Sequence, residues 1–324
     1  MPWQHLTLEQ REVLAQMTCR AEHPQEIAAA LGCHRGTVYR EWRRNRTGQE
    51  YFPARAQAVA QGRRRASKSA WKMAQPALAA YVQAKLQQYW SPQQIAGRLK
   101  LDFPDEPAMR ISHQGIYAWI AVQKAEGGFW QTYLRQARRQ RRKRYGTAEK
   151  RGRIVGRVGI EARPAGVAAK ARPGDWESDT IVGSGSSVCL ASHVERVSQY
   201  TVLAKLPDGK AASLNAGTVR AFGRHGKLPL LTLTADNGKE FAAHAELTAQ
   251  LGAPVYFARP YHAWERGLNE NTNGLVRQFF PKGLDLSQIS GHDVRRVERL
   301  LNTRPRKTLG YRTPLEMLSE LGWP

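Results

Sequence analysis

Cysteine is scarce in this chain, and long apolar runs are absent from its sequence. The 324 residues include three cysteines, Cys19, Cys33 and Cys189. Because they are odd in number and far apart, they argue against a disulfide framework and for a reducing compartment. The sequence contains no run of roughly 18 apolar residues, the length that a bilayer span requires. The first residues lack the pattern of a secretory signal. The nine histidines never fall into Cys/His zinc spacing, so we expect an intracellular protein without a zinc finger.

Acidic residues are few relative to basic ones. Asp and Glu total 27 against 50 Lys and Arg, which gives a formal net charge of +23. This excess excludes an ordinary metabolic enzyme with a balanced surface and indicates a polyanionic partner. Nucleic acid is favoured over an anionic membrane, because no segment of the sequence targets a bilayer. Apolar residues make up 41 %, and the length suits two or three domains with real cores.

The basic residues concentrate in two runs, residues 62–72 and 135–153. Such a run is often a solvated linker, but a cationic arm also neutralises DNA phosphates and releases counterions. We therefore expect basic linkers at residues 51–74 and 126–170. The DNA contacts expected from the second run come from four adjacent residues: Arg141, Arg142, Lys143 and Arg144.

A weak internal repeat lies in the N-terminal part, where residues 24–31 match residues 92–99. The apolar spacing in each copy predicts two short helices joined by a turn. In the first copy, Gly32 stands where the first helix must end, and the second helix is predicted over residues 34–45. The repeat therefore predicts two helical units of the same kind.

The second helix of the first copy is rich in arginine. A structural hairpin with a basic solvent face is one interpretation. The turn and the net charge favour a helix-turn-helix unit, whose second helix enters the major groove of DNA. Arginine suits guanine there, because its guanidinium can donate hydrogen bonds to O6 and N7 of the base at the same time. The candidate DNA contacts on this helix are Arg35, Thr37, Arg40, Arg43 and Arg44.

The second copy carries fewer basic residues. Ser91 before Pro92 makes a good helix start, and Ser112 or His113 can cap the following helix. His113 is its candidate DNA contact, and protein contacts are the alternative role for this copy. We place the first helix-turn-helix domain at residues 1–50 and the second at residues 75–125.

After residue 170 the pattern changes to strands and helices separated by Gly, Asn, Asp and Pro. Short turns join the first three strands and allow antiparallel pairing, whereas the later strands alternate with helices and favour parallel pairing. Residues 171–324 are therefore expected to form an α/β domain with a mixed five-stranded sheet flanked by helices. The strands are predicted at residues 176–182, 188–193, 201–206, 230–234 and 255–257, and the helices at residues 211–222, 239–251, 265–279 and 292–302.

Three acidic residues are unexpected in a domain that must contact phosphate. Asp179 lies on the first predicted strand, Asp236 follows a later strand, and Glu270 lies on a helix, with 33 residues between the last two. Strand alternation alone cannot choose among Asp175, Glu177 and Asp179; we select Asp179 because it lies deepest in the apolar run. A plain turn is the alternative role for Asp236, since Asn-Gly follows it.

Such a set of carboxylates fits phosphoryl transfer. Two divalent metals about 3.5–4 Å apart activate the attacking oxygen and stabilise the leaving one, and Mg²⁺ prefers oxygen ligands. We therefore predict Asp179, Asp236 and Glu270 as catalytic residues and ligands of two Mg²⁺ ions, with Mn²⁺ as a substitute. Glu265 lies about 140° around the helix from Glu270, so the two cannot share one site. Arg277 lies two turns after Glu270 on nearly the same face, where it can meet a phosphate.

Taken together, these residues resemble the D-D-E transposases and retroviral integrases, and most closely the IS-thirty family of bacterial insertion-sequence transposases. The resemblance covers nearly the whole chain. It rests on residues 176–179 (WESD), 234–241 (TADNGKEF), 264–275 (WERGLNENTNGL), 280–283 (FPKG) and 301–310 (LNTRPRKTLG).

The resemblance implies an RNase H-like fold for the C-terminal domain, with Asp179, Asp236 and Glu270 as the metal-binding triad. It also implies that the two helix-turn-helix units bind the terminal inverted repeats of the element. The expected protein is a transposase that cleaves DNA strands and transfers them to target DNA. It would act as a homo-oligomer, at least a dimer on DNA, in the bacterial cytoplasm at the nucleoid and without a membrane partner.

Two other functions are compatible with the same sequence. One is a DNA-binding regulator whose RNase H-like module is not catalytic, which would bind selectively without metal-dependent cleavage. The other is a structure-selective nuclease, which would hydrolyse DNA but never join strands.

Overall fold

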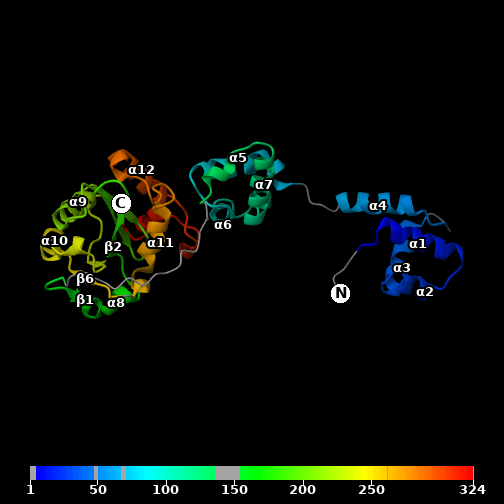
Figure 1. Ribbon diagram of the computed structural model, residues 1–324, viewed down its shortest axis with the longest axis horizontal. Coiled ribbons are helices and arrows are strands. Elements are labelled where there is room, and N and C mark those ends of the chain that lie inside the picture. Colours follow the sequence, from blue (N-terminus) through cyan, green and yellow to red (C-terminus); the bar gives the residue numbers. More distant parts are fainter. Residues whose placement is uncertain (1–4, 47–49, 67–70, 136–153, 261, 324) are drawn as a thin grey trace. The chain divides into compact units, whose positions relative to one another are not determined.

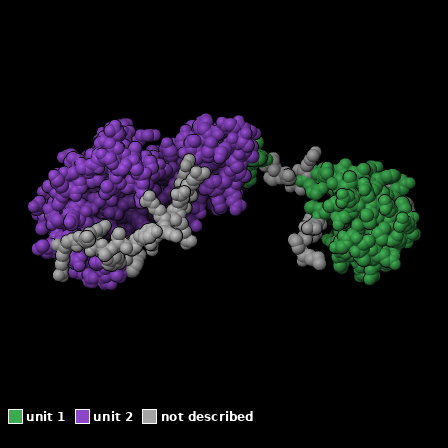
Figure 2. Space-filling model, viewed as in Figure 1, with its two compact units in different colours: residues 1–74 green, residues 75–324 purple. Residues whose placement is uncertain are grey.

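The computed structural model describes residues 5–46, 50–66, 71–135, 154–260 and 262–323. The chain divides into two compact units, Met1–Ala74 and Gln75–Pro324 (Figure 1; Figure 2). Four of the predicted DNA contacts lie outside the described residues: Arg141, Arg142, Lys143 and Arg144.

Capping side chains set the helix starts of the first unit. Thr7 forms a capping box with Gln10, and His23 caps a helix that has Pro24 at its first position. Gly32, with a φ of 64°, makes the turn that the sequence predicted. The described helices of this unit are α1 (Leu8–Cys19), α2 (Pro24–Ala30), α3 (Arg35–Asn45) and α4 (Pro53–Ala66). The helix pair α2 and α3 thus has the expected helix-turn-helix layout.

Helix α4 corrects the prediction that residues 51–74 are a linker. The helix contains five alanines, the residue of highest helix propensity, and it packs against α1 and α3. Tyr51 and Ala56 belong to the core of the unit. The Tyr51 hydroxyl donates a hydrogen bond to Glu41 at 2.9 Å, and Glu41 pairs with the buried Arg11 at 2.7 Å. The part of the basic run that lies in this helix, residues 62–66, is therefore not a linker, and Arg63 is exposed on the helix surface.

The second unit begins with three helices, α5 (Pro76–Gln87), α6 (Pro92–Asp102) and α7 (His113–Ala125). The Ser91 hydroxyl accepts a hydrogen bond from the first turn of α6, and the Ser112 hydroxyl does the same for α7. Both helix starts agree with the sequence prediction. Helices α6 and α7 are the second copy of the repeat.

A mixed sheet forms the centre of the α/β part. The strands are β1 (Val158–Gly159), β2 (Asp175–Val182), β3 (Cys189–Glu195), β4 (Thr201–Leu206), β5 (Thr232–Ala235) and β6 (Val255–Phe257). Their order across the sheet is β1-β6-β5-β2-β3-β4. Strands β2, β3 and β4 pair antiparallel, and β2, β5, β6 and β1 pair parallel. Both pairing types are as predicted.

The sheet has six strands in the described residues rather than the five expected. The additional strand β1 lies in residues 126–170, which were predicted as a linker. That segment also contains η3 (Trp130–Tyr133), η4 (Ile160–Ala162) and α8 (Ala165–Ala168). None of these elements has the apolar run or period that marks longer ones, because each is only two to four residues long.

Helices cover both faces of the sheet. One core contains Trp176, Phe222, Phe241 and Phe257, and the other contains side chains such as Ile181 of β2 and residues of α11 and α12. The helices of this part are α9 (Ala211–Gly223), α10 (His244–Leu251), α11 (Gly267–Val276), α12 (Gly291–Asn302) and α13 (Pro314–Glu320). Elements labelled η are short 3-10 helices, and the others in the chain are η1 (Lys72–Ala74), η2 (Pro107–Met109), η5 (Lys239–Phe241), η6 (Ala263–Arg266), η7 (Leu286–Gln288) and η8 (Lys307–Leu309). No helix in the described ranges is long and apolar enough to cross a membrane.

Candidate active site

The register of two parallel strands brings two aspartates together. Strand β2 pairs with β5 so that Asp175 lies opposite Thr232 and Glu177 lies opposite Thr234. Continued by two residues, the same register places Asp179 level with Asp236, which directly follows β5. Since neighbouring strands lie about 4.8 Å apart, these two carboxylates are neighbours although they are far apart in the sequence.

The guanidinium of Arg266 bridges the two aspartates. Its Nη1 lies 3.3 Å from Oδ2 of Asp179, and its Nη2 lies 3.7 Å from Oδ2 of Asp236. The aspartate side chains are 22 % and 23 % exposed. Burial raises the pKa of Asp179, the charge of Arg266 opposes this shift, and the nearby Asp236 adds to it. One positive charge therefore faces two negative ones in a half-buried site.

Helix α11 runs along β2 and holds Asp179 in place. The Asn273 amide donates a hydrogen bond to Oδ2 of Asp179 at 3.0 Å. One turn earlier, the Asn269 backbone N–H donates to Oε2 of Glu177 at 3.0 Å. Glu177 and Asp179 are two strand residues apart, and Asn269 and Asn273 are four helix residues apart. Both separations are about 6–7 Å, so the helix can bond both acids as it runs along the strand. The Ser192 hydroxyl, on β3, contacts Oδ1 of Asn273 at 2.6 Å and completes the support.

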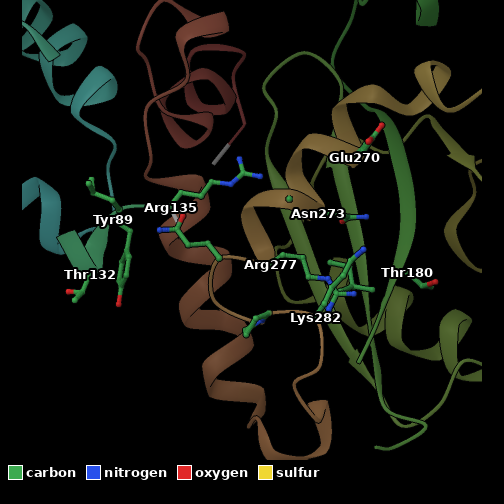
Figure 3. A pocket seen from close by; sticks show the side chains of 13 residues that line it. Tyr89, Thr132, Arg135, Thr180, Glu270, Asn273, Arg277 and Lys282 are labelled. Atoms are coloured by element: carbon green, nitrogen blue, oxygen red, sulfur yellow. The ribbon is translucent and has the colours of Figure 1, made fainter. Parts of the chain in front are cut away.

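Glu270 lies on α11 between these two asparagines, and its side chain is exposed. Together with Asn273 and Thr180 it lines a cleft of about 830 Å³ (Figure 3). Residues three apart on a helix are neighbours, so Glu270 adjoins the residue that bonds Asp179. Within the described residues, however, no group of three His, Cys, Asp or Glu side chains is arranged to hold a metal ion. The two aspartates therefore converge, and Glu270 lies on the helix that bonds Asp179 without completing a metal site.

Asp175 and Glu177 lie on the same face of β2 as Asp179, and both have buried structural partners. Asp175 accepts a hydrogen bond from the Thr232 hydroxyl at 2.7 Å, and Glu177 pairs with Arg196 as well as with α11. Burial raises the pKa of Glu177. Of the three acids on this face of β2, only Asp179 is not fully buried.

Arg277 caps the C-terminal end of α11 and also lines the cleft. Its Nη2 donates a hydrogen bond to the Val182 carbonyl at 2.6 Å, and burial lowers its pKa. The helix thus carries Glu270 and Arg277 into the same cleft, as their two-turn spacing predicted. A contact between Arg277 and phosphate stays a prediction.

The predicted DNA contacts of the helix-turn-helix units lie at helix surfaces. On α3, the four arginines are exposed and Thr37 is partly exposed. Arg40 donates from Nε to the Gly36 carbonyl at 2.9 Å, which directs its side chain along the helix. In the second copy, His113 is exposed as the first residue of α7. The set with these positions is Arg35, Thr37, Arg40, Arg43, Arg44 and His113.

Three residues of the site were not singled out from the sequence: Arg266, Asn273 and Ser192. Arg266 and Asn273 stand in the block WERGLNENTNGL, where a signal existed. Asn269 and Asn273 are polar residues four apart on the helix face that packs on the sheet, a position where apolar residues are usual. Ser192 had no such signal, because serine in a buried strand is common.

Comparison with known proteins adds the family. The family model described as an integrase core domain matches residues 169–263, and one described as a helix-turn-helix domain matches residues 3–45. The transposase for insertion sequence element IS4351 of Bacteroides fragilis is 40 % identical over 98 % of this chain and 96 % of its own length. The transposase for IS1086 of Cupriavidus metallidurans is 42 % identical over 91 % of this chain and 88 % of its own.

The transposase InsI for insertion sequence element IS30A of Escherichia coli is 35 % identical over 97 % of this chain and 83 % of its own length. The chain belongs to the IS30 (IS-thirty) family of insertion-sequence transposases. An IS30-family transposase with an integrase core is a DNA-binding polynucleotidyl transferase, which confirms the predicted fold class and function. The integrase-core match includes Asp179 and Asp236 and ends before Glu270.

Proposed function

We propose that Asp179, Asp236 and Glu270 hold two divalent metal ions and that the chain uses them to cleave and join DNA strands at the ends of an insertion sequence. Mg²⁺ is the proposed ion, with Mn²⁺ as a substitute. One observation carries the proposal: a carboxylate on β2 and one directly after β5 converge on a single cation, Arg266, beside the helix that bears Glu270.

The donor set suits such ions. Carboxylate oxygens are the ligands that Mg²⁺ prefers, and Oδ2 of each aspartate already faces the same positive group. A divalent ion would bring twice the charge of the guanidinium to this pair. The proposal requires two movements, withdrawal of Arg266 and rotation of the exposed Glu270 side chain toward Asp179.

The residues of the chain set the geometry of the reaction. Bound metals would activate the attacking oxygen, first of water and then of a DNA 3′-hydroxyl, and would stabilise the leaving oxygen. Asp179 is oriented by Asn273 and by the Thr180 backbone N–H, which donates to its Oδ1 at 2.8 Å. Asp236 is oriented by the Gly238 N–H at 2.9 Å. Arg277 would position the scissile phosphate from the C-terminal end of α11.

Recognition of the element's ends belongs to the helical units in this proposal. The residues of α3 would contact base edges and phosphates of the terminal inverted repeats, His113 would add a contact from α7, and residues 141–144 would contact phosphates of the ends or of target DNA. Two ends must be paired, so we propose at least a dimer on DNA. We place the reaction in the bacterial cytoplasm, on nucleoid DNA.

The test is a strand-cleavage and strand-joining assay on terminal-repeat DNA with Mg²⁺ or Mn²⁺. We expect Asp236→Asn and Glu270→Gln to reduce both products to background while leaving DNA binding intact. Glu246→Gln, an exposed acid on α10, is the matched control and should keep full activity. Wild-type activity in either site variant would reject the proposal. Cleavage without joining would indicate a nuclease, and selective binding without cleavage by the wild type would indicate a regulator.

A further inference from the structure

The cleft beside Glu270 is built from two parts of the second unit that are far apart in the sequence. Tyr89, just after α5, and Thr132, in η3, come from the helical part (Figure 3). Glu270 and Arg277 come from α11 and its C-terminal end, opposite these residues. The cleft therefore exists only where the helical part meets the α/β part.

Specific contacts fix these two parts to each other. Arg98 of α6 forms a two-pronged ion pair with Glu316 of α13, each N–O distance being 2.6 Å. The Gln94 amide donates to the Pro305 carbonyl at 2.7 Å. Next to the cleft itself, the Gln278 amide donates to the Tyr133 carbonyl at 3.3 Å. Because these contacts join the parts at separate places, the walls of the cleft are held at a set separation.

The charged side chains of the lining are mainly basic. Among the described residues, Arg135, Arg277 and Lys282 line the cleft together with one acid, Glu270. Arg304 contacts Gln278 of the lining and adds a further positive charge. Burial and the nearby Arg306 and Arg135 lower its pKa to about 9, which still leaves it charged at neutral pH. Within the described residues, the hydrogen bonds of Arg304 go to the amide oxygens of two glutamines rather than to a carboxylate. Positive charge that is not balanced by acids favours a polyanion in the cleft.

Tyr89 gives the cleft an aromatic wall. Its ring makes T-shaped contacts with Phe279, at 4.9 Å between centroids, and with Tyr133, at 5.4 Å. Its backbone φ is 62°, in the left-handed region that ends a helix and that glycine adopts with least strain. A large aromatic side chain at such a position carries a backbone cost, and two ring contacts hold it in place at the cleft wall.

Basic side chains combined with an aromatic wall are the features that bind single-stranded nucleic acid. The volume of about 830 Å³ lies in the range of pockets for small organic molecules, about 300–1,000 Å³. It accommodates a few nucleotides of one strand but not a duplex.

We propose that this cleft binds an unpaired DNA strand beside the catalytic carboxylates, with a base against Tyr89 and phosphates against Arg277 and Lys282. The inference rests on the proposed function and specifies which form of the DNA end the site takes. The end of the element would be unpaired locally, so that one strand passes Glu270 while its partner is excluded.

The experiment compares two DNA probes on the full chain without divalent metal, so that no turnover occurs. One probe is a terminal-repeat duplex with a short single-stranded overhang that carries a fluorescent base analogue, and the other is the same duplex with a blunt end. We expect wild type to bind the overhang probe more tightly and to quench its fluorescence. Tyr89→Leu should weaken overhang binding roughly tenfold, the scale of one lost base–aromatic stack, and leave blunt binding unchanged.

Three further variants complete the design. Tyr89→Phe should behave as wild type, because the ring remains. Lys282→Gln should weaken overhang binding, whereas Lys227→Gln, an exposed lysine with the same charge change, should not. If Tyr89→Leu does not fold, the comparison of overhang binding between Lys282→Gln and Lys227→Gln tests the inference instead. Equal overhang binding in wild type, Tyr89→Leu and Lys282→Gln would overturn the inference.

The result also separates this inference from the proposed function. Asp236→Asn should lose cleavage and retain the overhang preference. Loss of the preference in the cleft variants of a protein that never cleaves DNA would uphold the cleft and reject the catalytic proposal. Full cleavage by a wild type that shows no overhang preference would uphold the catalytic proposal and reject the cleft.

Discussion

Arg266 is the residue on which the electrostatics of the site depend. It contacts both aspartates at 3.3 and 3.7 Å, so it offsets the repulsion that two partly buried carboxylates would otherwise suffer. Its Nε is buried without a hydrogen-bond partner among the described residues. A cation that is incompletely bonded in its position is easier to displace, which suits a site where another cation is to enter.

Replacing this arginine tests its role as a counter-ion. Arg266→Gln should destabilise the metal-free chain by about 1–3 kcal/mol, because two partly buried carboxylates are left without their counter-ion. Added Mn²⁺ should then raise the Tm of the variant by more than it raises that of wild type, since the competing charge is gone. Thermal melts with and without Mn²⁺ measure both effects, and Arg220→Gln, an exposed arginine of α9, is the control. An unchanged Tm with an unchanged Mn²⁺ response would contradict this role.

The sequence could identify the acids of the site but not the contacts that orient them. Asp179 and Asp236 stand out because carboxylates are rare at the ends of apolar strands in a basic chain. The bridge by Arg266 and the bond from Asn273 depend on which face of α11 meets β2 and at what height. Those quantities are set by tertiary packing, and a linear pattern carries no measure of them.

Among the elements, α6 determines whether the helical part stays docked. Gly97 faces the Tyr311 ring so closely that a Cβ at this position would lie 2.3 Å from a ring carbon. The neighbouring Arg98 holds Glu316 and lowers its pKa to about 2. The contribution of this pair to stability is therefore fully present above pH 4.5, the ordinary value for Glu, and is lost only as the pH falls toward about 2.

A single methyl group should loosen this docking. Gly97→Ala forces the Tyr311 ring to move and should cost about 1–3 kcal/mol, the usual penalty for overpacking. Hydrogen–deuterium exchange should increase in α6 and in residues 304–316. Gly223→Ala, where a Cβ meets no atom within 4 Å, should change exchange in neither segment. Unchanged protection in Gly97→Ala would show that the close approach does not hold the two parts together.

Helix α3 is the element expected to read sequence. Arg35 is exposed at the start of the helix, and Arg40 lies along it, bonded to the Gly36 carbonyl. Replacing both with alanine should reduce the ratio of affinities for terminal-repeat and random DNA by about 1–3 kcal/mol for each base contact. Parallel binding titrations on the two DNAs measure the ratio. Equal losses on both would mean that α3 contacts only phosphates.

Elements with strong periodic patterns were predictable, and short or composition-biased ones were not. The five predicted strands have apolar runs bounded by turn residues, and each is present with shifts of at most two residues at its ends. Strand β1 has two residues and no pattern of its own. Helix α4 was not predicted, because its arginines indicated a linker although its alanines favour a helix.

For the whole molecule, the net charge of +23 governs binding to DNA of any sequence. If about eight phosphates are neutralised, log affinity should fall with log salt at a slope of about −7. Titrations at several salt concentrations give this slope directly. A slope shallower than about −3 would mean that the basic segments serve mainly as linkers.

In the proposed reaction, three carboxylates from distant parts of the chain close on divalent metal. A crystal structure of the full chain with Mn²⁺ and one terminal-repeat end tests it most directly, because the anomalous signal of manganese locates the ions. We expect manganese bound by Asp179, Asp236 and Glu270, with Arg266 moved away from both aspartates. Manganese bound elsewhere, with Arg266 still bridging Asp179 and Asp236 and Glu270 turned to solvent, would contradict it.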